Sequence, residues 1–265
     1  MTFSDSTIAA LVICMILAVL IPIAAVIVFK LKNRDARLPC ALIGAGTFIL
    51  FAIILEGQLL HSIMRPIVSG NAVAYVLYGA LAAGIFEETG RFIAYKTIMK
   101  NNLTTKNAVM MGLGHGGAEM LLLLGFSMIS LIGSAMMVNS DGLESVIRTL
   151  SAGNAEKAVL IRAQLESLTA YNFGTMALSI YERLLAMTFH VCMSVIVFHA
   201  VTQPGKMRLY VLAVILHALL DVPAAMYQVG ALSIPVVYIA MTIFTAIVVG
   251  LTITMTKKYS GRDEF

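Results

Sequence analysis

The chain has 265 residues, of which 60% are hydrophobic and only 12% are charged, about half the charged share of an ordinary globular domain. This composition excludes a soluble globular protein and indicates a polytopic membrane protein. The formal net charge of +4 does not predict a nucleic-acid partner, because the Lys and Arg residues fall at the ends of apolar segments and form no patch.

Several apolar runs are long enough to cross a membrane, which takes about 20 residues of helix. They lie at residues 7–29, 38–60, 72–99, 107–138, 174–201, 207–228 and 232–256. We therefore expect an all-α bundle of about seven transmembrane helices, forming a single membrane domain over residues 1–265. The third and fourth runs exceed the required length, so we expect them to tilt, to kink at glycine or to project beyond the bilayer.

The basic residues are concentrated in alternate loops, and such loops lie on the cytoplasmic side of a membrane. They are Lys30, Lys32, Arg34 and Arg37; Lys96, Lys100 and Lys106; Lys206 and Arg208; and Lys257, Lys258 and Arg262. This pattern predicts an N-terminus outside the cell and a C-terminus in the cytoplasm.

The longest segment between apolar runs is 139–171, which the predicted orientation makes extracytoplasmic. Its apolar residues recur at roughly helical intervals among charged ones. This amphipathic pattern predicts one or two helices with a break near Gly153 and Asn154. The segment either caps the bundle, lies on the membrane surface or is a solvated linker with helical content.

Three charged residues, Glu87, Glu88 and Arg91, lie inside the apolar run at 72–99. A charged side chain at the centre of a membrane helix costs roughly 2.5–3.5 kcal/mol, so the cluster predicts a functional site. Arg91 follows the two acids by one helical turn and can reach either of them. One acid can then be held by Arg91 while the other handles a proton; the alternative is an internal ion pair that fixes helix packing.

The next run carries His115 and Glu119 one turn apart on one helical face, within a glycine-rich stretch. The glycines permit a close approach by a neighbouring helix or a substrate. Both residues are predicted to belong to the site. For His115 alone, a hydrogen-bonded histidine in a glycine-rich packing seam remains an alternative.

Two later runs add His190 and the pair His217 and Asp221. His190 belongs either to the site or to the core, as a hydrogen-bonded histidine. His217 and Asp221 are one turn apart, so the acid can accept a hydrogen bond from one ring nitrogen and leave the other directed at a ligand or a reacting oxygen.

The depth of these residues in the membrane follows from about 1.5 Å per residue, counted from the cytoplasmic basic residues. The polar groups fall within one or two turns of a common level, with His190 slightly deeper. This convergence predicts a site in the cytoplasmic half of the membrane, within a catalytic core at residues 80–225. Glu56, Gln58 and His61 fall toward the outer end and are interpreted as interfacial or packing residues.

The ordered set of Glu87-Glu88-x-x-Arg91, an acid or histidine on the next helix, and His217-x-x-x-Asp221 resembles the superfamily of CAAX-processing and bacteriocin-processing (CPBP) intramembrane proteases. It is most similar to the PrsW-like and YhfC-like branch of bacterial membrane peptidases, over residues 80–225. Two features depart from the CAAX prenyl protease pattern. Two residues instead of three separate the glutamate pair from the arginine, and His115 stands where that pattern has phenylalanine, with Glu119 in the catalytic position.

The resemblance implies a glutamate-dependent intramembrane endopeptidase in the bacterial plasma membrane. Such an enzyme hydrolyses peptide bonds with a carboxylate-activated water, without a covalent intermediate and without a metal or other cofactor. The implied roles are general base for Glu87 or Glu88, assistance for Glu119 or His115, oxyanion stabilisation for His217 and Asp221, and support of the glutamate pair for Arg91. The expected partners are a membrane protein or lipidated peptide as substrate and the lipid bilayer.

Three alternatives stay open. The first is a zinc-dependent membrane protease, with ligands drawn from His115, Glu119, His190, His217 and Asp221. The second is a proton- or ion-coupled transporter, in which buried carboxylates and histidines form a relay, although the two halves of the sequence show no inverted-repeat symmetry. The third is a catalytically inactive scaffold or immunity-type protein that retains the fold.

Overall fold

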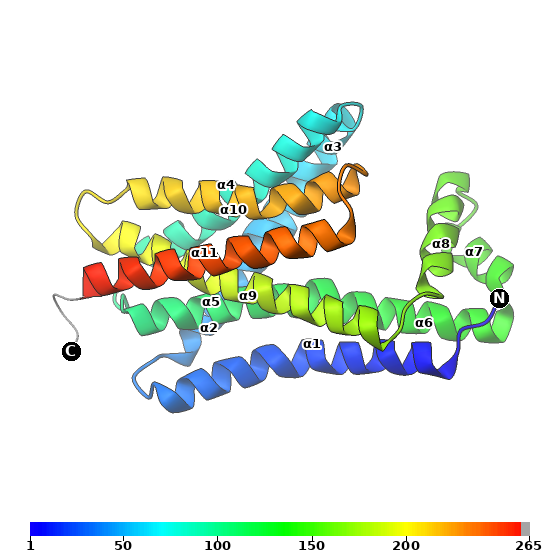
Figure 1. The fold of residues 1–265 in the computed structure, drawn as a ribbon, viewed down its shortest axis with the longest axis horizontal. Helices are drawn as coiled ribbons and strands as arrows, with labels where there is room; N and C mark the ends of the chain where they lie inside the picture. Colours follow the sequence, from blue (N-terminus) through cyan, green and yellow to red (C-terminus); the bar gives the residue numbers. More distant parts are fainter. Residues whose placement is uncertain (261–265) are drawn as a thin grey trace. The chain divides into compact units, whose positions relative to one another are not determined.

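The computed structural model describes residues 1–260 of the chain (Figure 1). Residues 261–265, among them Arg262 of the orientation argument, lie outside the described residues. The described part is all-helical, which confirms the predicted fold class. Its elements are α1 (Asp5–Lys32), α2 (Leu38–Thr47), η1 (Phe48–Leu60), α3 (His61–Val68), α4 (Ala72–Lys96), α5 (Thr105–Glu119), η2 (Met120–Gly125), α6 (Phe126–Asp141), α7 (Leu143–Ser151), α8 (Ala155–Leu168), α9 (Phe173–Thr202), α10 (Arg208–Gln228) and α11 (Ile234–Ser260).

Six helical segments of the described chain are long and apolar enough to cross a membrane. They are Asp5–Lys32, Leu38–Val68, Thr105–Asp141, Phe173–Thr202, Arg208–Gln228 and Ile234–Tyr259. Helix α4 has 25 residues and comparable length, but it carries the charged cluster of Glu87, Glu88 and Arg91. The protein is therefore a membrane helix bundle, while the count of seven spans and the orientation stay predictions.

Two of the long apolar segments contain a π-helical stretch. Segment η1 continues α2 over 13 residues, and η2 continues α5 over six. In both places the sequence predicted one long helix, at residues 38–60 and 107–138. The run at 107–138 was expected to tilt, to kink at glycine or to project beyond the bilayer. Short π-helical insertions inside α-helices are frequent at functional sites.

The described chain divides into two compact units. The first comprises Met1–Ile21 and Met120–Arg183. Within it, α7 and α8 are separated by Ala152 and Gly153, both with positive φ, and the Asn154 side chain caps α8 by accepting a hydrogen bond from the backbone N–H of Lys157 at 2.9 Å. The predicted break near Gly153 and Asn154 is therefore present, with one short helix on either side of it. Their extracytoplasmic location stays a prediction.

The second unit comprises residues 22–119 and those from 184 onward, and it contains every residue predicted for the site. Within it, α10 lies beside both α4 and α11, as Figure 1 shows. A Cβ atom added at Gly84 of α4 would lie only 2.6 Å from the backbone oxygen of Val214 in α10. Glycine at this position therefore lets the two backbones meet.

Glycine residues also let α5 pack closely against its neighbours. A Cβ atom at Gly114 would lie 1.9 Å from the backbone oxygen of Ala41 in α2, and one at Gly112 would lie 2.5 Å from Cα of Val191 in α9. Side chains on α5, His115 among them, are thereby brought close to α2 and α9.

Replacing Gly44 in α2 by alanine is expected to destabilise the fold. The added Cβ would lie 2.0 Å from the backbone oxygen of Met111, so α2 and α5 would have to separate. Overpacking of this kind lowers the free energy of unfolding by about 1–3 kcal/mol or more. Thermal melting of the purified protein in detergent measures the change.

The matched control is Gly46→Ala in the same helix, because a Cβ atom at Gly46 meets nothing within 4 Å. This variant is expected to melt at or above the wild-type temperature, since alanine is the better helix former by about 0.5–1 kcal/mol. Equal melting temperatures for the two variants would contradict the close approach of α2 and α5.

Candidate functional site

Four helices of the second unit bring the eight predicted residues into one connected cluster. The residues are Glu87, Glu88 and Arg91 on α4, His115 and Glu119 on α5, His190 on α9, and His217 and Asp221 on α10. All but Glu119 and Asp221 are buried. The common depth counted from the sequence therefore corresponds to real proximity.

Glu87 lies at the centre of the cluster. Its Oε2 atom is 2.8 Å from Nε2 of His115, 3.9 Å from Nδ1 of His190 and 3.9 Å from Nε2 of His217. The nearest nitrogen of Arg91 is 3.7 Å away. Because an ionised carboxylate only accepts hydrogen bonds, His115 donates its Nε2–H to Glu87.

Glu88, the next residue after Glu87, forms a fully buried ion pair with Arg91 one helical turn further along α4. Nη1 of Arg91 donates to Oε1 of Glu88 at 2.5 Å, and neither side chain reaches the surface. The same Glu88 oxygen accepts from Nδ1 of His217 at 2.6 Å. The pair thus joins α4 to α10.

The second guanidinium nitrogen of Arg91 joins α4 to α9. Nη2 lies 2.7 Å from Nδ1 of His190. Arginine only donates, so this histidine nitrogen accepts and the ring proton lies on Nε2. That nitrogen lies within ion-pair distance of Oε2 of Glu119.

His190 and His217 therefore share one arrangement. Each has one ring nitrogen beside a carboxylate and another that faces Glu87. His217 donates to Glu88, and His190 lies at ion-pair distance from Glu119. Metal-binding histidines almost always donate their second ring nitrogen to such a partner, which fixes the ring and the tautomer.

Asp221 differs from the other three acids of the cluster. Its Oδ2 atom is 3.7 Å from Nε2 of His217, beyond hydrogen-bond distance, and its side chain is 35% exposed. It makes no hydrogen bond with another residue of the described chain. It is the site acid most open to an incoming molecule.

Two residues that the sequence did not assign to the site are also part of its surroundings. Thr47 lies 3.3 Å from Nδ1 of His115 and donates its hydroxyl to the Gly44 carbonyl. Glu56, in the π-helical segment η1, is buried and close enough to Glu87 and Asp221 to interact with them electrostatically. An acid inside an apolar run is the signal that could have identified Glu56, but its distance along the chain placed it at the outer end.

The donor atoms of the cluster suit a metal ion. Among the described residues, Glu87, His190 and His217 each offer one ligand atom, and these atoms lie within 4.8 Å of one another. Two histidines and a glutamate are a known ligand set of catalytic zinc. Glu88 Oε2 is buried beside them without a hydrogen-bond partner in the described chain, as a site that binds a further group allows.

Comparisons with known proteins agree with this geometry. Residues 17–243 match a family model described as YhfC intramembrane metalloprotease. The Bacillus subtilis (strain 168) protein named "Uncharacterized membrane protein YhfC" is 36% identical over 220 residues, which are 81% of this chain and 82% of that protein. No solved structure matches the chain. The resemblance to YhfC-like proteins and the prediction of a multi-pass bacterial membrane protein are thus confirmed.

The expectation of a site without a cofactor is wrong. A family of metalloproteases implies a metal ion, and the carboxylate and imidazole donors around Glu87 provide a place for one. The sequence could not decide between the two mechanisms, because the same acids and histidines can activate water directly or bind a metal.

The buried ion pair yields a test of the site's architecture. Changing Glu88 to glutamine leaves the charge of Arg91 without its closest partner, so the free energy of unfolding is expected to fall by about 3–5 kcal/mol. The double variant Glu88→Gln/Arg91→Met, which removes both charges, is expected to recover part of this loss. Melting curves in detergent measure both effects.

Glu166→Gln serves as the control, because Glu166 pairs with Arg162 at 3.9 Å on the surface. Exposed pairs of this type contribute about 0.3–0.5 kcal/mol, so this variant is expected to melt nearly as the wild type does. A Glu88→Gln variant as stable as Glu166→Gln would show that the buried pair does not support the fold.

Proposed function

Because the chain belongs to the YhfC family of intramembrane metalloproteases, we propose that it is a metal-dependent membrane peptidase whose active site is the cluster around Glu87. One observation carries the proposal: one ring nitrogen of His190 and one of His217 face the Glu87 carboxylate. The other ring nitrogen of each histidine lies beside a second carboxylate, Glu119 for His190 and Glu88 for His217. This is the arrangement that metal-binding histidines require.

Glu87, His190 and His217 would hold the ion, and His115 would fix the Glu87 carboxylate through its hydrogen bond. Zinc bound by three protein ligands supplies a Lewis acid that polarises a peptide carbonyl and favours ionisation of a bound water. His190 has one condition to meet. Its Nδ1 atom must exchange the hydrogen bond from Arg91 for the ion.

Glu88 and Arg91 are positioning residues in this proposal. Both are inaccessible, so neither can touch a substrate. Glu88 orients His217, and Arg91 holds Glu88 while neutralising part of the acidic charge. This differs from the role of general base that the resemblance offered for Glu88.

Asp221 is the residue we assign to proton transfer. It is the most exposed of the four site acids, and it makes no hydrogen bond with another described residue, so its oxygens can accept from water. Asp221 takes one proton from the attacking water as the C–O bond forms. It returns that proton to the leaving nitrogen as the peptide C–N bond breaks.

The proposed substrate is a peptide bond in a membrane protein or lipidated peptide, since the cluster lies among membrane-spanning helices. The transporter alternative receives no support from the family comparison. A relay would also need polar groups in succession across the membrane, whereas those of this site gather around one carboxylate.

Metal binding and proton transfer can be separated by two variants. Glu87→Gln removes a proposed ligand and is expected to lose bound zinc as well as activity. Asp221→Asn is expected to keep wild-type zinc content and to cleave about 10²–10⁴-fold more slowly, the usual contribution of a general acid or base. Elemental analysis of the purified protein gives the metal content, and cleavage of a membrane-peptide library in proteoliposomes gives the rate.

His199→Ala is the control for Glu87→Gln. His199 is also buried in α9, but it contacts the Thr256 hydroxyl at 3.4 Å and none of the cluster. It should retain its zinc. A Glu87→Gln variant with full zinc and full activity would end the proposal, and a fully active Asp221→Asn variant would remove Asp221 from the mechanism.

Removal of the metal provides an independent test. Treatment with a chelator is expected to abolish cleavage by the wild-type protein, and added zinc is expected to restore it. Zinc should not rescue Asp221→Asn. Unchanged cleavage by protein shown to be free of metal would support direct activation of water by a carboxylate and contradict a metalloprotease.

A further inference from the structure

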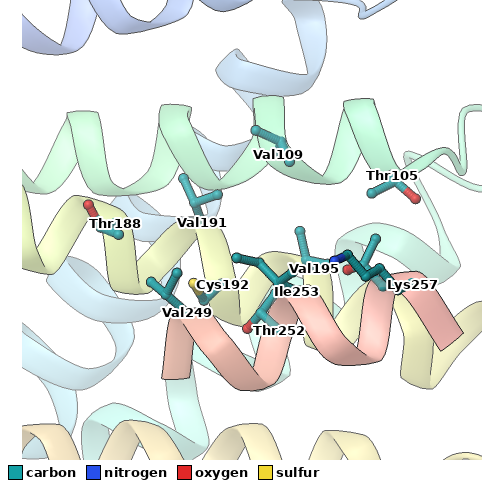
Figure 2. A pocket seen from close by; sticks show the side chains of 11 residues that line it. Thr105, Val109, Thr188, Val191, Cys192, Val195, Val249, Thr252, Ile253 and Lys257 are labelled. Carbon is teal, nitrogen blue, oxygen red and sulfur yellow. The ribbon is translucent and has the colours of Figure 1, made fainter. Parts of the chain in front are cut away.

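A groove of about 380 Å³ lies in the second unit, between α5, α9 and α11 (Figure 2). Five aliphatic side chains line it, and the threonines, Cys192 and Lys257 beside them present almost only apolar atoms to the groove. The aliphatic residues are Val109, Val191, Val195, Val249 and Ile253. An apolar space of this kind does not hold ordered water, which needs several polar partners. A bound molecule with a long hydrocarbon part would fit it.

The groove is separate from the metal cluster, although both involve α9. The groove residues Thr188, Val191 and Val195 follow one another by three and four positions and so share a face of the helix. His190 follows Thr188 by two positions, about 200° around the axis, and points to the opposite side. Neither the catalytic proposal nor the family description accounts for the groove.

Positive charge is found at one end of the groove. Lys257, near the end of α11, lines it there, together with Thr105, the first residue of α5 (Figure 2). A helix N-terminus has a partial positive charge, which favours an anion, although at α5 the Thr104 hydroxyl already accepts from the N–H of Asn107 at 3.2 Å. The groove therefore combines an apolar channel with a cationic end.

The size of the groove favours a flexible chain over a helix. From Val249 to Lys257 it extends for eight residues of α11, about 12 Å. A helix with its side chains is about 10 Å across, so it needs a much wider space than a single hydrocarbon chain does. A second copy of this chain or a substrate helix could only lie across the groove, whereas an acyl chain can enter it.

We propose that this groove binds an anionic phospholipid, with an acyl chain between α9 and α11 and the phosphate at Lys257 and the N-terminus of α5. Basic pockets between membrane helices recognise anionic headgroups in this way. The site does not depend on the peptidase mechanism, and its test measures lipid binding without any cleavage reaction.

The test uses full-length protein, stripped of lipid and titrated with phosphatidylglycerol or phosphatidylcholine in detergent, with native mass spectrometry as the readout. Wild-type protein is expected to retain one phosphatidylglycerol in preference to phosphatidylcholine. One lysine near a membrane surface contributes about a fivefold preference for an anionic lipid, so Lys257→Gln should lose about that factor. Lys258→Gln is the matched control, because Lys258 is the next residue and does not line the groove.

A second variant tests the apolar part. Ile253 is half-exposed, so Ile253→Trp is expected to leave the fold and the melting temperature intact while filling the groove. It should reduce retention of both lipids. The proposal is overturned if Lys257→Gln and Lys258→Gln have equal effects, if wild-type protein does not discriminate between the lipids, or if Ile253→Trp abolishes a dimer instead of lipid binding.

Discussion

The charge of Arg91, buried in an apolar helix, is the constraint on which the second unit depends. An arginine at the centre of a membrane helix costs roughly 2.5–3.5 kcal/mol, and the cost is reduced only where partners meet its donors. Glu88 supplies the charge and His190 a second acceptor, from α4 and α9 respectively. His217 then binds the same Glu88 oxygen from α10. Three helices are held in register by one guanidinium group and the carboxylate beside it.

Such polar contacts form only where helix backbones come close, and glycine provides that closeness. Gly84 lets α4 meet α10, and Gly112 lets α5 meet α9. In a bilayer, helices gain little from hiding apolar surface from one another, so close packing and buried hydrogen bonds must hold them together. The polar contacts of the cluster therefore depend on the glycines, because these small residues let the helices come as close as the ion pair and the histidines require.

Much of this site could be predicted from the sequence, because ionisable residues in apolar runs are few and helical depth can be counted. All eight candidates fall into the cluster for that reason. Individual contacts could not be predicted, since spacing along one helix does not say which histidine faces which acid on another. Glu56 was interpreted as an interfacial or packing residue, and its ion-pair partner is His61 at 3.5 Å, although its electrostatic surroundings also include Glu87 and Asp221. The need for a metal was missed because its ligands and the groups of a metal-free hydrolase are the same residue types.

Exposure divides the four acids of the cluster according to what each can do. The side chain of Glu88 is 0% exposed, that of Glu87 9%, that of Glu119 13% and that of Asp221 35%. Glu88, the least exposed acid, contacts Arg91 and His217 and so stabilises the packing of α4 against α10. Glu87 and Glu119, which have intermediate exposure, contact histidines that must keep one orientation. Asp221, the most exposed acid, makes no hydrogen bond to the rest of the described chain. A hydrolase within a membrane needs both kinds of carboxylate, because its charges must be held in an apolar surrounding while one of them still meets water.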